Sequence, residues 1–172
     1  MAEDPLRLRI LKKLSEVIAE VNPDNDPIYT QDLKNSVFRG RVIFGENDPL
    51  PMVSILEVPL PIDQVVAPTG SPASSGAWEL IIQGFSCDDH ENPTDPAHHL
   101  MAQVKRRLVQ ERKKAQCIMS PEKGIFGMGN HVTDLQISPG VVRPPDELSA
   151  KAYFWLAITL KLVEDLDNPY ED

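Results

Sequence analysis

Proline divides this sequence into short segments, and this punctuation is the strongest constraint on its fold. The chain of 172 residues contains 16 prolines, a share about twice the usual one. They cluster between apolar segments, at 22–27, 49–51, 59–72, 93–96 and 139–145. Because proline fixes its φ angle and lacks a backbone N–H, a helix or strand is expected to end at each cluster. The regular elements must therefore lie between these regions.

The composition is that of an ordinary globular protein. It is 41% hydrophobic and 25% charged, and a chain of this length can bury most of its surface in one domain, which we expect to span 1–172. No apolar run approaches the roughly 20 residues of a membrane span, and the N-terminus lacks the features of a signal peptide. We therefore expect a protein kept in a cytoplasm-like compartment.

Two further features of the composition exclude broad classes of partner. Cys87 and Cys117 lie in different segments, without the spacing of a disulfide scaffold or zinc site, and are expected to be free thiols. The net charge of -9 argues against general affinity for nucleic acid phosphates or anionic membranes.

Hydrophobic periodicity predicts the element order α-β-β-β-α-β-β. The expected helices are 6–21 and 95–115, with Asp4 and Asp95 as N-caps. The expected strands are 36–45, 52–58, 77–85, 130–137 and 150–163, the first three as a meander. This order predicts an α+β fold, a mostly antiparallel sheet with two main helices packed on it.

Three other segments carry structural expectations. The stretch 67–76 has no large apolar side chain, which predicts a mobile loop at about 59–76 inside the domain. The glycine-rich segment 124–129 precedes a strand rather than a helix, so we expect a turn or a flexible contact loop and no phosphate site. Four aromatic residues in strongly apolar strands are expected in the core: Trp78, Tyr153, Phe154 and Trp155.

The search for catalytic chemistry is mostly negative. No nucleotide-binding, nucleophile-elbow or zinc-protease motif occurs. The best cluster of metal-ligand types is 87–91 together with His98 and His99. Adjacent residues on a helix point about 100° apart, so these two histidines do not readily face one ion. Acidic residues before a helix are also favoured by the helix dipole alone, and we predict no metal, cofactor or catalytic residue.

The second predicted helix is strongly basic in its C-terminal half. Six of the 17 basic residues of the chain lie there: Lys105, Arg106, Arg107, Arg112, Lys113 and Lys114. They are expected on the flank opposite the apolar stripe. Cations favour a helix C-terminus whatever the function. A nucleic-acid surface is a second interpretation, although no aromatic residue lies nearby to support it.

A third interpretation is assembly, because the rest of the chain is acidic. The basic flank would contact the acidic C-terminal segment of a neighbouring copy, a head-to-tail contact that closes a ring. Arg39 and Arg41 share a face of the first predicted strand, as the solvent side of a half-covered sheet or as a polar contact surface. The candidate interface residues are Arg39, Arg41, Lys105, Arg106, Arg112, Lys113, Glu164 and Asp165.

The order of several segments carries a resemblance to a known family. The N-terminal amphipathic helix is followed by Phe38-Arg-Gly-Arg-Val-Ile-Phe44. Then Trp78-Glu-Leu-Ile-Ile-Gln-Gly84 leads through Asp88-Asp-His-Glu-Asn-Pro93 to Ala97-His-His-Leu100 and the basic helix. A long last strand with an acidic end completes the order. Over most of its length the chain resembles the tail terminator family of long-tailed bacteriophages.

The resemblance implies a non-enzymatic virion protein, assembled in the cytoplasm of the bacterial host. Such a protein forms a homo-hexameric ring on the tail tube, ends tube polymerisation and offers a surface to a head-completion or connector protein. It has no cofactor and no membrane partner, and DNA only passes through the ring lumen as the genome. The segment 59–76 is where departure from a minimal member is expected.

Three other functions remain open from the sequence. The nearest is another neck or head–tail connector protein. A more distant one is a small metal-dependent nuclease or hydrolase that uses Asp88, Asp89, His90 and either His98 or His99. The third is a DNA-binding accessory protein that uses the basic helix.

Overall fold

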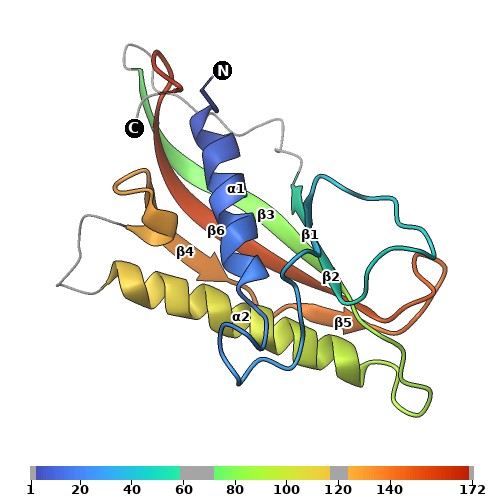
Figure 1. Cartoon of the computed structure of the whole chain (residues 1–172). Helices are drawn as coiled ribbons and strands as arrows, with labels where there is room; N and C mark the ends of the chain where they lie inside the picture. Colours follow the sequence, from blue (N-terminus) through green and yellow to red (C-terminus); the bar gives the residue numbers. More distant parts are fainter. Residues whose placement is uncertain (1–2, 59–71, 117–123, 171–172) are drawn as a thin grey trace.

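Two helices lie on one face of a six-stranded sheet (Figure 1). The computed structural model describes residues 3–58, 72–116 and 124–170. The helices are α1 (Leu6–Ala19) and α2 (Asp95–Ala115). The strands are β1 (Val37–Arg39), β2 (Met52–Glu57), β3 (Ala73–Phe85), β4 (Val132–Ile137), β5 (Val141–Arg143) and β6 (Tyr153–Asp165). The α+β fold and the predicted element order are confirmed, with β5 as an additional short strand.

The centre of the sheet is the antiparallel pair of β3 and β6. The two strands pair over 13 residues each, from Ala73 opposite Asp165 to Phe85 opposite Tyr153. On the other side of β3 lie β2, antiparallel, and then β1, parallel to β2. Both β4 and β5 pair antiparallel with β6. The sheet is therefore mixed but mostly antiparallel.

Alternate residues of the central pair form the core beneath the helices. Successive side chains of a strand point to opposite faces, so every second residue of β3 and β6 faces α1 and α2. The buried sheet residues include Trp78, Leu80, Ile82, Phe154, Leu156, Ile158, Leu160 and Leu162. The helices contribute Leu6, Ile10, Leu14, Ile18, Leu100, Val104 and Leu108 to the same cluster. Each fully buried side chain of this size contributes about 1.5–3 kcal/mol. In the described segments, neither helix is long and apolar enough to cross a membrane.

The first strand is shorter than predicted and pairs differently. β1 ends at Arg39 because Gly40 turns the chain with a φ of 65°. Since β1 is parallel to β2, the predicted meander of the first three strands is wrong. The residues after Gly40 cross over the end of the sheet instead, where the Ser54 hydroxyl donates a hydrogen bond of 2.6 Å to the carbonyl of Arg41.

Both predicted aspartate N-caps are also wrong. The N-cap residues are Pro5 and Thr94, and neither helix has a side-chain cap hydrogen bond. Asp4 instead forms an ion pair with Lys12, eight residues further along the chain. Asp95 lies inside the first turn of α2, where its charge still suits the helix dipole.

Two predicted loops fall differently along the chain. β3 begins at Ala73, so the end of the predicted loop 59–76 is strand, and residues 59–71 lie outside the described residues. The glycine-rich segment 124–129 is a turn, the first of the two structures expected for it. Its short helix η1 (Ile125–Gly127) buries Ile125 and Phe126 to 4% and 3% exposure. This turn is therefore part of the core.

Gly84 of β3 allows the ring of Phe154 to pack directly against the strand. A Cβ atom at this position would overlap the ring of Phe154, which lies directly across on β6. We predict that Gly84→Ala lowers the free energy of unfolding by about 2 kcal/mol, because the core is overpacked. Chemical denaturation measures this change. Gly76→Ala, in the same strand with no atom near the added carbon, is the matched control and should cost less than about 1 kcal/mol. Equal effects of the two variants would contradict the prediction.

Candidate functional site

The acidic and histidine-rich segment before α2 does not assemble a metal site. Asp88 forms an ion pair with Lys151. Asp89 accepts hydrogen bonds of 2.9 Å from the backbone N–H groups of Glu91 and Asn92. Within the described part of the chain, which includes all of 87–99, no three histidine, cysteine or acidic side chains are placed to hold one ion. The ligands named for a metal-dependent enzyme, which also included His90, His98 and His99, are therefore not brought together.

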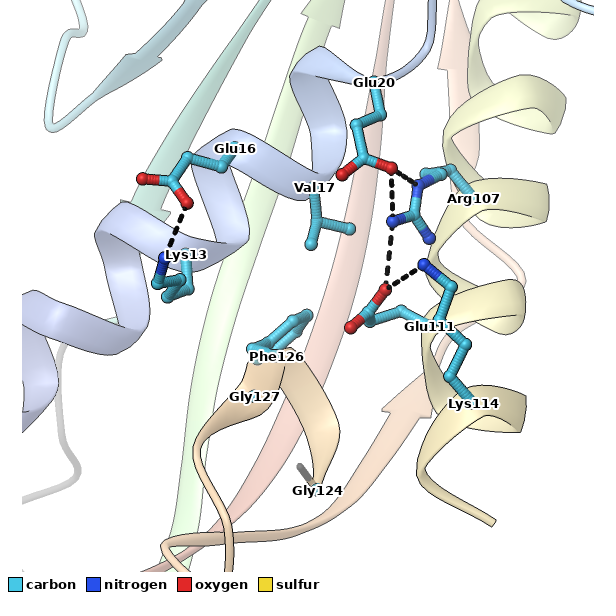
Figure 2. A pocket seen from close by; sticks show the side chains of 10 residues that line it. All are labelled: Lys13, Glu16, Val17, Glu20, Arg107, Glu111, Lys114, Gly124, Phe126 and Gly127. Atoms are coloured by element: carbon cyan, nitrogen blue, oxygen red, sulfur yellow. Dashed lines mark hydrogen bonds and ion pairs between the residues drawn. The ribbon is translucent and has the colours of Figure 1, made fainter. Parts of the chain in front are cut away.

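Arg107 of α2 is buried, although it was predicted on the flank opposite the apolar stripe (Figure 2). Its side chain is 3% exposed. Its Nε and Nη2 atoms donate to Glu20 at 2.9 and 2.6 Å, and Nη2 donates to Glu111 at 2.9 Å. Lys114 lies 3.4 Å from the same Glu111 oxygen. This ionic cluster joins the end of α1 to the middle of α2.

Three more residues of the basic half differ in how far they are engaged. Arg106 lies 3.6 Å from Asp26, in the connection after α1. Lys105 donates to the carbonyl of Pro139. Lys113 is exposed and forms no ion pair with any residue that the structure describes. Part of the basic surface is therefore used inside the subunit, and Lys113 is available to a partner.

Arg112 occupies the edge of the sheet. Its Nη1 donates to the carbonyl of Leu135 in β4 at 3.4 Å, and the Asp134 carboxylate accepts from the N–H of Leu135 at 2.9 Å. Unpaired backbone groups of an edge strand would otherwise accept a strand of another chain. Side chains of this subunit therefore block part of the β4 edge. At the opposite edge, Arg39 ends β1 and is exposed.

The acidic end of β6 is held by α1. Arg7 donates to Glu164 from Nη2 at 2.6 Å and from Nε at 3.2 Å. The hydrogen bond and charge of Glu164 raise the pKa of Arg7, whose guanidinium lies 5.2 Å from the centre of the Trp78 ring. Asp165 is exposed. No contact joins Glu164 or Asp165 to the basic half of α2 in the described structure, so a contact between copies stays a prediction.

A pocket of about 510 Å³ lies between α1, α2 and η1 (Figure 2). Its apolar lining is provided by Val17 and Phe126, which are 6% and 3% exposed. The charged residues around it are Lys13, Glu16, Glu20, Arg107, Glu111 and Lys114. We call this the interhelix pocket.

The second face of the sheet carries no helix among the described elements, and part of it is apolar. Trp155 and Val163 of β6 are each 38% exposed, and Val141 of β5 is 47% exposed. Between them on β6, the exposed Ala157 lies opposite the half-buried Ile81 of β3. We call these five residues the open face. The expectation of a core position is wrong for Trp155 and confirmed for Trp78, Tyr153 and Phe154.

Two loops, 40–51 and 144–152, meet over one end of the open face (Figure 1). In the first, the Arg41 guanidinium pairs with Asp48 and lies 4.7 and 5.4 Å from the ring centres of Phe38 and Phe44. The backbone N–H of Gly45 and the guanidinium of Arg41 lower the pKa of Asp48. Arg41 was predicted to be a contact residue, and here it holds its own loop in place.

The second loop is held by Asp146. Its carboxylate accepts the Tyr153 hydroxyl at 2.8 Å and the N–H of Leu148 at 2.9 Å. These two hydrogen bonds lower the pKa of Asp146. Burial and the same carboxylate raise the pKa of Tyr153. Both loops therefore have defined conformations.

These loops present three exposed aliphatic side chains that the sequence analysis did not single out. Val42 is 67% exposed, Ile43 82% and Leu148 73%. We call these three residues the loop tip. Beside them is a pocket of about 400 Å³, whose apolar lining includes Phe44, Leu50, Met52 and Phe85. Gly40 was the sequence signal that could have indicated this exposure. It ends β1 two residues before Val42, so that Val42 and Ile43 lie in a loop and not in a strand.

No protein-family model matches this sequence, and a search among curated proteins finds no match to it. The function must therefore be argued from these surfaces and from the segment order described above.

The ionic cluster gives a test of the helix contact. We predict that Arg107→Met lowers the free energy of unfolding by about 2 kcal/mol, because Glu111 loses its buried partner. The matched control is Arg106→Met, whose ion pair is exposed and should cost less than about 1 kcal/mol. Urea denaturation measures the free energy of unfolding of both variants. A smaller loss for Arg107→Met than for Arg106→Met would contradict the burial of Arg107.

The two loop carboxylates predict a dependence of stability on pH. Both have a pKa below the ordinary value of 3.8 in the folded chain. Their ionised forms therefore stabilise the fold above pH 3.8, and this contribution is lost as the pH falls through the folded-state pKa. We expect the melting temperature of the double variant Asp48→Asn/Asp146→Asn to fall less steeply below pH 5 than that of the unchanged protein. Parallel curves in thermal denaturation at pH 2.5–6 would exclude this role of the carboxylates.

Proposed function

We propose that this protein is a virion structural protein, a tail terminator of a long-tailed bacteriophage. It forms a homo-hexameric ring on the tail tube, ends tube polymerisation and provides the surface for head-to-tail joining. The observation that carries the proposal is the open face, where apolar side chains of β5 and β6 are exposed without a covering helix in the described structure. Exposed apolar patches on a folded domain mark surfaces for association.

The mechanism is steric. A ring needs two different surfaces on each subunit, because each copy contacts one neighbour on either side. The open face, with the loop tip at one end of it, is one such surface, and the neighbouring copy contributes a different one. When the ring sits on the last ring of tube subunits, its outer side lacks the surface that the next tube subunit needs, and growth stops. A head-completion or connector protein then binds that outer side, and the genome passes through the lumen.

The segment order supports the terminator over a general assembly protein. The order of the elements is the one that resembles the family. It runs from the amphipathic helix α1 through the short strand β1 and the long central strand β3 to the basic helix α2 and the long last strand β6. A head–tail connector ring is the alternative that shares these surfaces. Binding to tail tubes distinguishes the two, because a terminator binds the tube end directly.

A charge at the centre of the open face tests the proposal. We expect Ala157→Arg to lower the fraction of protein in rings at least about tenfold at fixed concentration, because a buried unpaired charge disfavours the contact. The matched control is Ala102→Arg, at an exposed alanine of α2, which should assemble like the unchanged protein. Sedimentation velocity gives the fraction, with and without tail tubes, and negative-stain images give the shape.

Thermal denaturation should show equal melting temperatures for the two alanine variants, since both side chains are exposed in the subunit. If Ala157→Arg assembles to the same extent as Ala102→Arg, the open face is not an assembly surface.

A further inference from the structure

We propose that neighbouring copies meet head to tail, with the loop tip of one copy bound at the interhelix pocket of the next. This inference rests on the proposed function, since it names the contact that closes the ring. It differs from the predicted contact of the acidic C-terminal segment with the basic helix, in which Glu164 is already paired with Arg7 inside the subunit.

Acidic side chains surround the loop tip. Glu46 and Glu147 lie in the same loops, are exposed and form no ion pair within the described chain. The adjacent segment 86–93 adds Asp89 and Glu91, whereas Asp88 is paired with Lys151. The nearby basic side chains of Arg41 and Lys151 are already paired with Asp48 and Asp88. The loop tip therefore combines exposed aliphatic side chains with unpaired negative charge.

The interhelix pocket has the complementary character. Val17 and Phe126 provide an apolar floor for an aliphatic side chain. Lys13 and Lys114 on the rim are 52% and 64% exposed. Lys113, exposed beside Lys114, adds a positive charge without a partner in the described structure.

The acidic residues on the rim balance Lys13, Arg107 and Lys114, and they leave Lys113, beside the pocket, with its positive charge unpaired in the described structure. Glu16 is paired with Lys13, and Glu20 and Glu111 are paired with Arg107. Unpaired positive charge at one surface and unpaired negative charge at the other favour association in one orientation.

The two surfaces lie at opposite ends of α2 (Figure 1). The interhelix pocket is beside its C-terminal half, and the loop tip is beyond its N-terminal end. The 21 residues of α2 span about 30 Å. The loop tip therefore cannot reach the pocket of its own copy, and a contact between two copies uses unlike surfaces, as ring closure requires.

Mixing two variants tests the contact. Ile43→Asp removes the loop tip and keeps the pocket, whereas Lys13→Glu/Lys113→Glu reverses the charge at the pocket and keeps the loop tip. Each alone should self-associate at least about tenfold more weakly than the unchanged protein. Mixed in equal amounts, they should form a dimer of one copy each, because one intact contact remains between them. Native mass spectrometry with one variant isotopically labelled identifies that dimer.

The matched control is Leu166→Asp, at another aliphatic side chain that is 49% exposed and lines neither the interhelix pocket nor the pocket beside the loop tip. It should assemble like the unchanged protein. If the unchanged protein forms rings and Ile43→Asp forms them equally well, the inference is overturned and the proposed function stands. Rings lost in Leu166→Asp as well as in Ile43→Asp would also overturn it.

If the unchanged protein forms no ring, alone or with tail tubes, the proposed function is refuted. Disulfide trapping then tests the contact between copies independently. The double variant Ile43→Cys/Lys13→Cys is made with Cys87→Ser and Cys117→Ser, and each single cysteine variant is the control. Oxidation should give a ladder of multimers in the double variant and no dimer in either single variant, because a bond between position 43 of one copy and position 13 of the next needs both changes. Monomer or dimer alone in the double variant would overturn the inference.

Discussion

The pairing of β3 with β6 is the constraint on which the other elements depend. Their 13-residue register fixes which side chains face the helices, and β2, β4 and β5 attach to this pair on either side. Because Gly84 has no side chain, the ring of Phe154 packs over β3 in the core beneath the helices. Because α1 and α2 both cover the same face, the pair also leaves Trp155, Ala157 and Val163 exposed on the other. The surface assigned to assembly is thus a direct consequence of how the core is built.

Charge has two separate uses in this chain. Arg41, Arg107 and Arg112 satisfy partners inside the subunit: Arg41 holds a loop, Arg107 joins the helices, and Arg112 closes part of a sheet edge. Such pairs set the positions of the surfaces around them, and the loop held by Arg41 presents Val42 and Ile43 to solvent. The charges without a partner in the described structure, such as Lys113 and Glu147, are the ones available for contact with another molecule. The number of charges along the sequence does not distinguish these two uses, whereas the hydrogen bonds and ion pairs of the folded chain distinguish them.

The helices and the last strand could be predicted because their signals are local. Apolar residues at helical spacing specify α1 and α2, and alternation from Tyr153 onward specifies β6. The parallel pairing of β1 could not be predicted, because it depends on the path of 40–51 across the sheet and on the turn at Gly40. The burial of Arg107 could not be predicted, because its partner Glu20 is 87 residues away in the sequence. Val42 and Ile43 were placed in a strand by the same alternation that succeeded for β6. The sequence identified the basic helix as a candidate site, whereas the open face and the loop tip required the structure.

The central claim is that this protein acts through its surfaces, as a closed ring. Native mass spectrometry of the unchanged protein, alone and with tail tubes, tests this claim most directly when combined with negative-stain images. We expect a mass of six copies and a six-fold ring with a central channel in at least one of the two conditions. A monomer mass in both conditions, without rings at the tube ends, would contradict it.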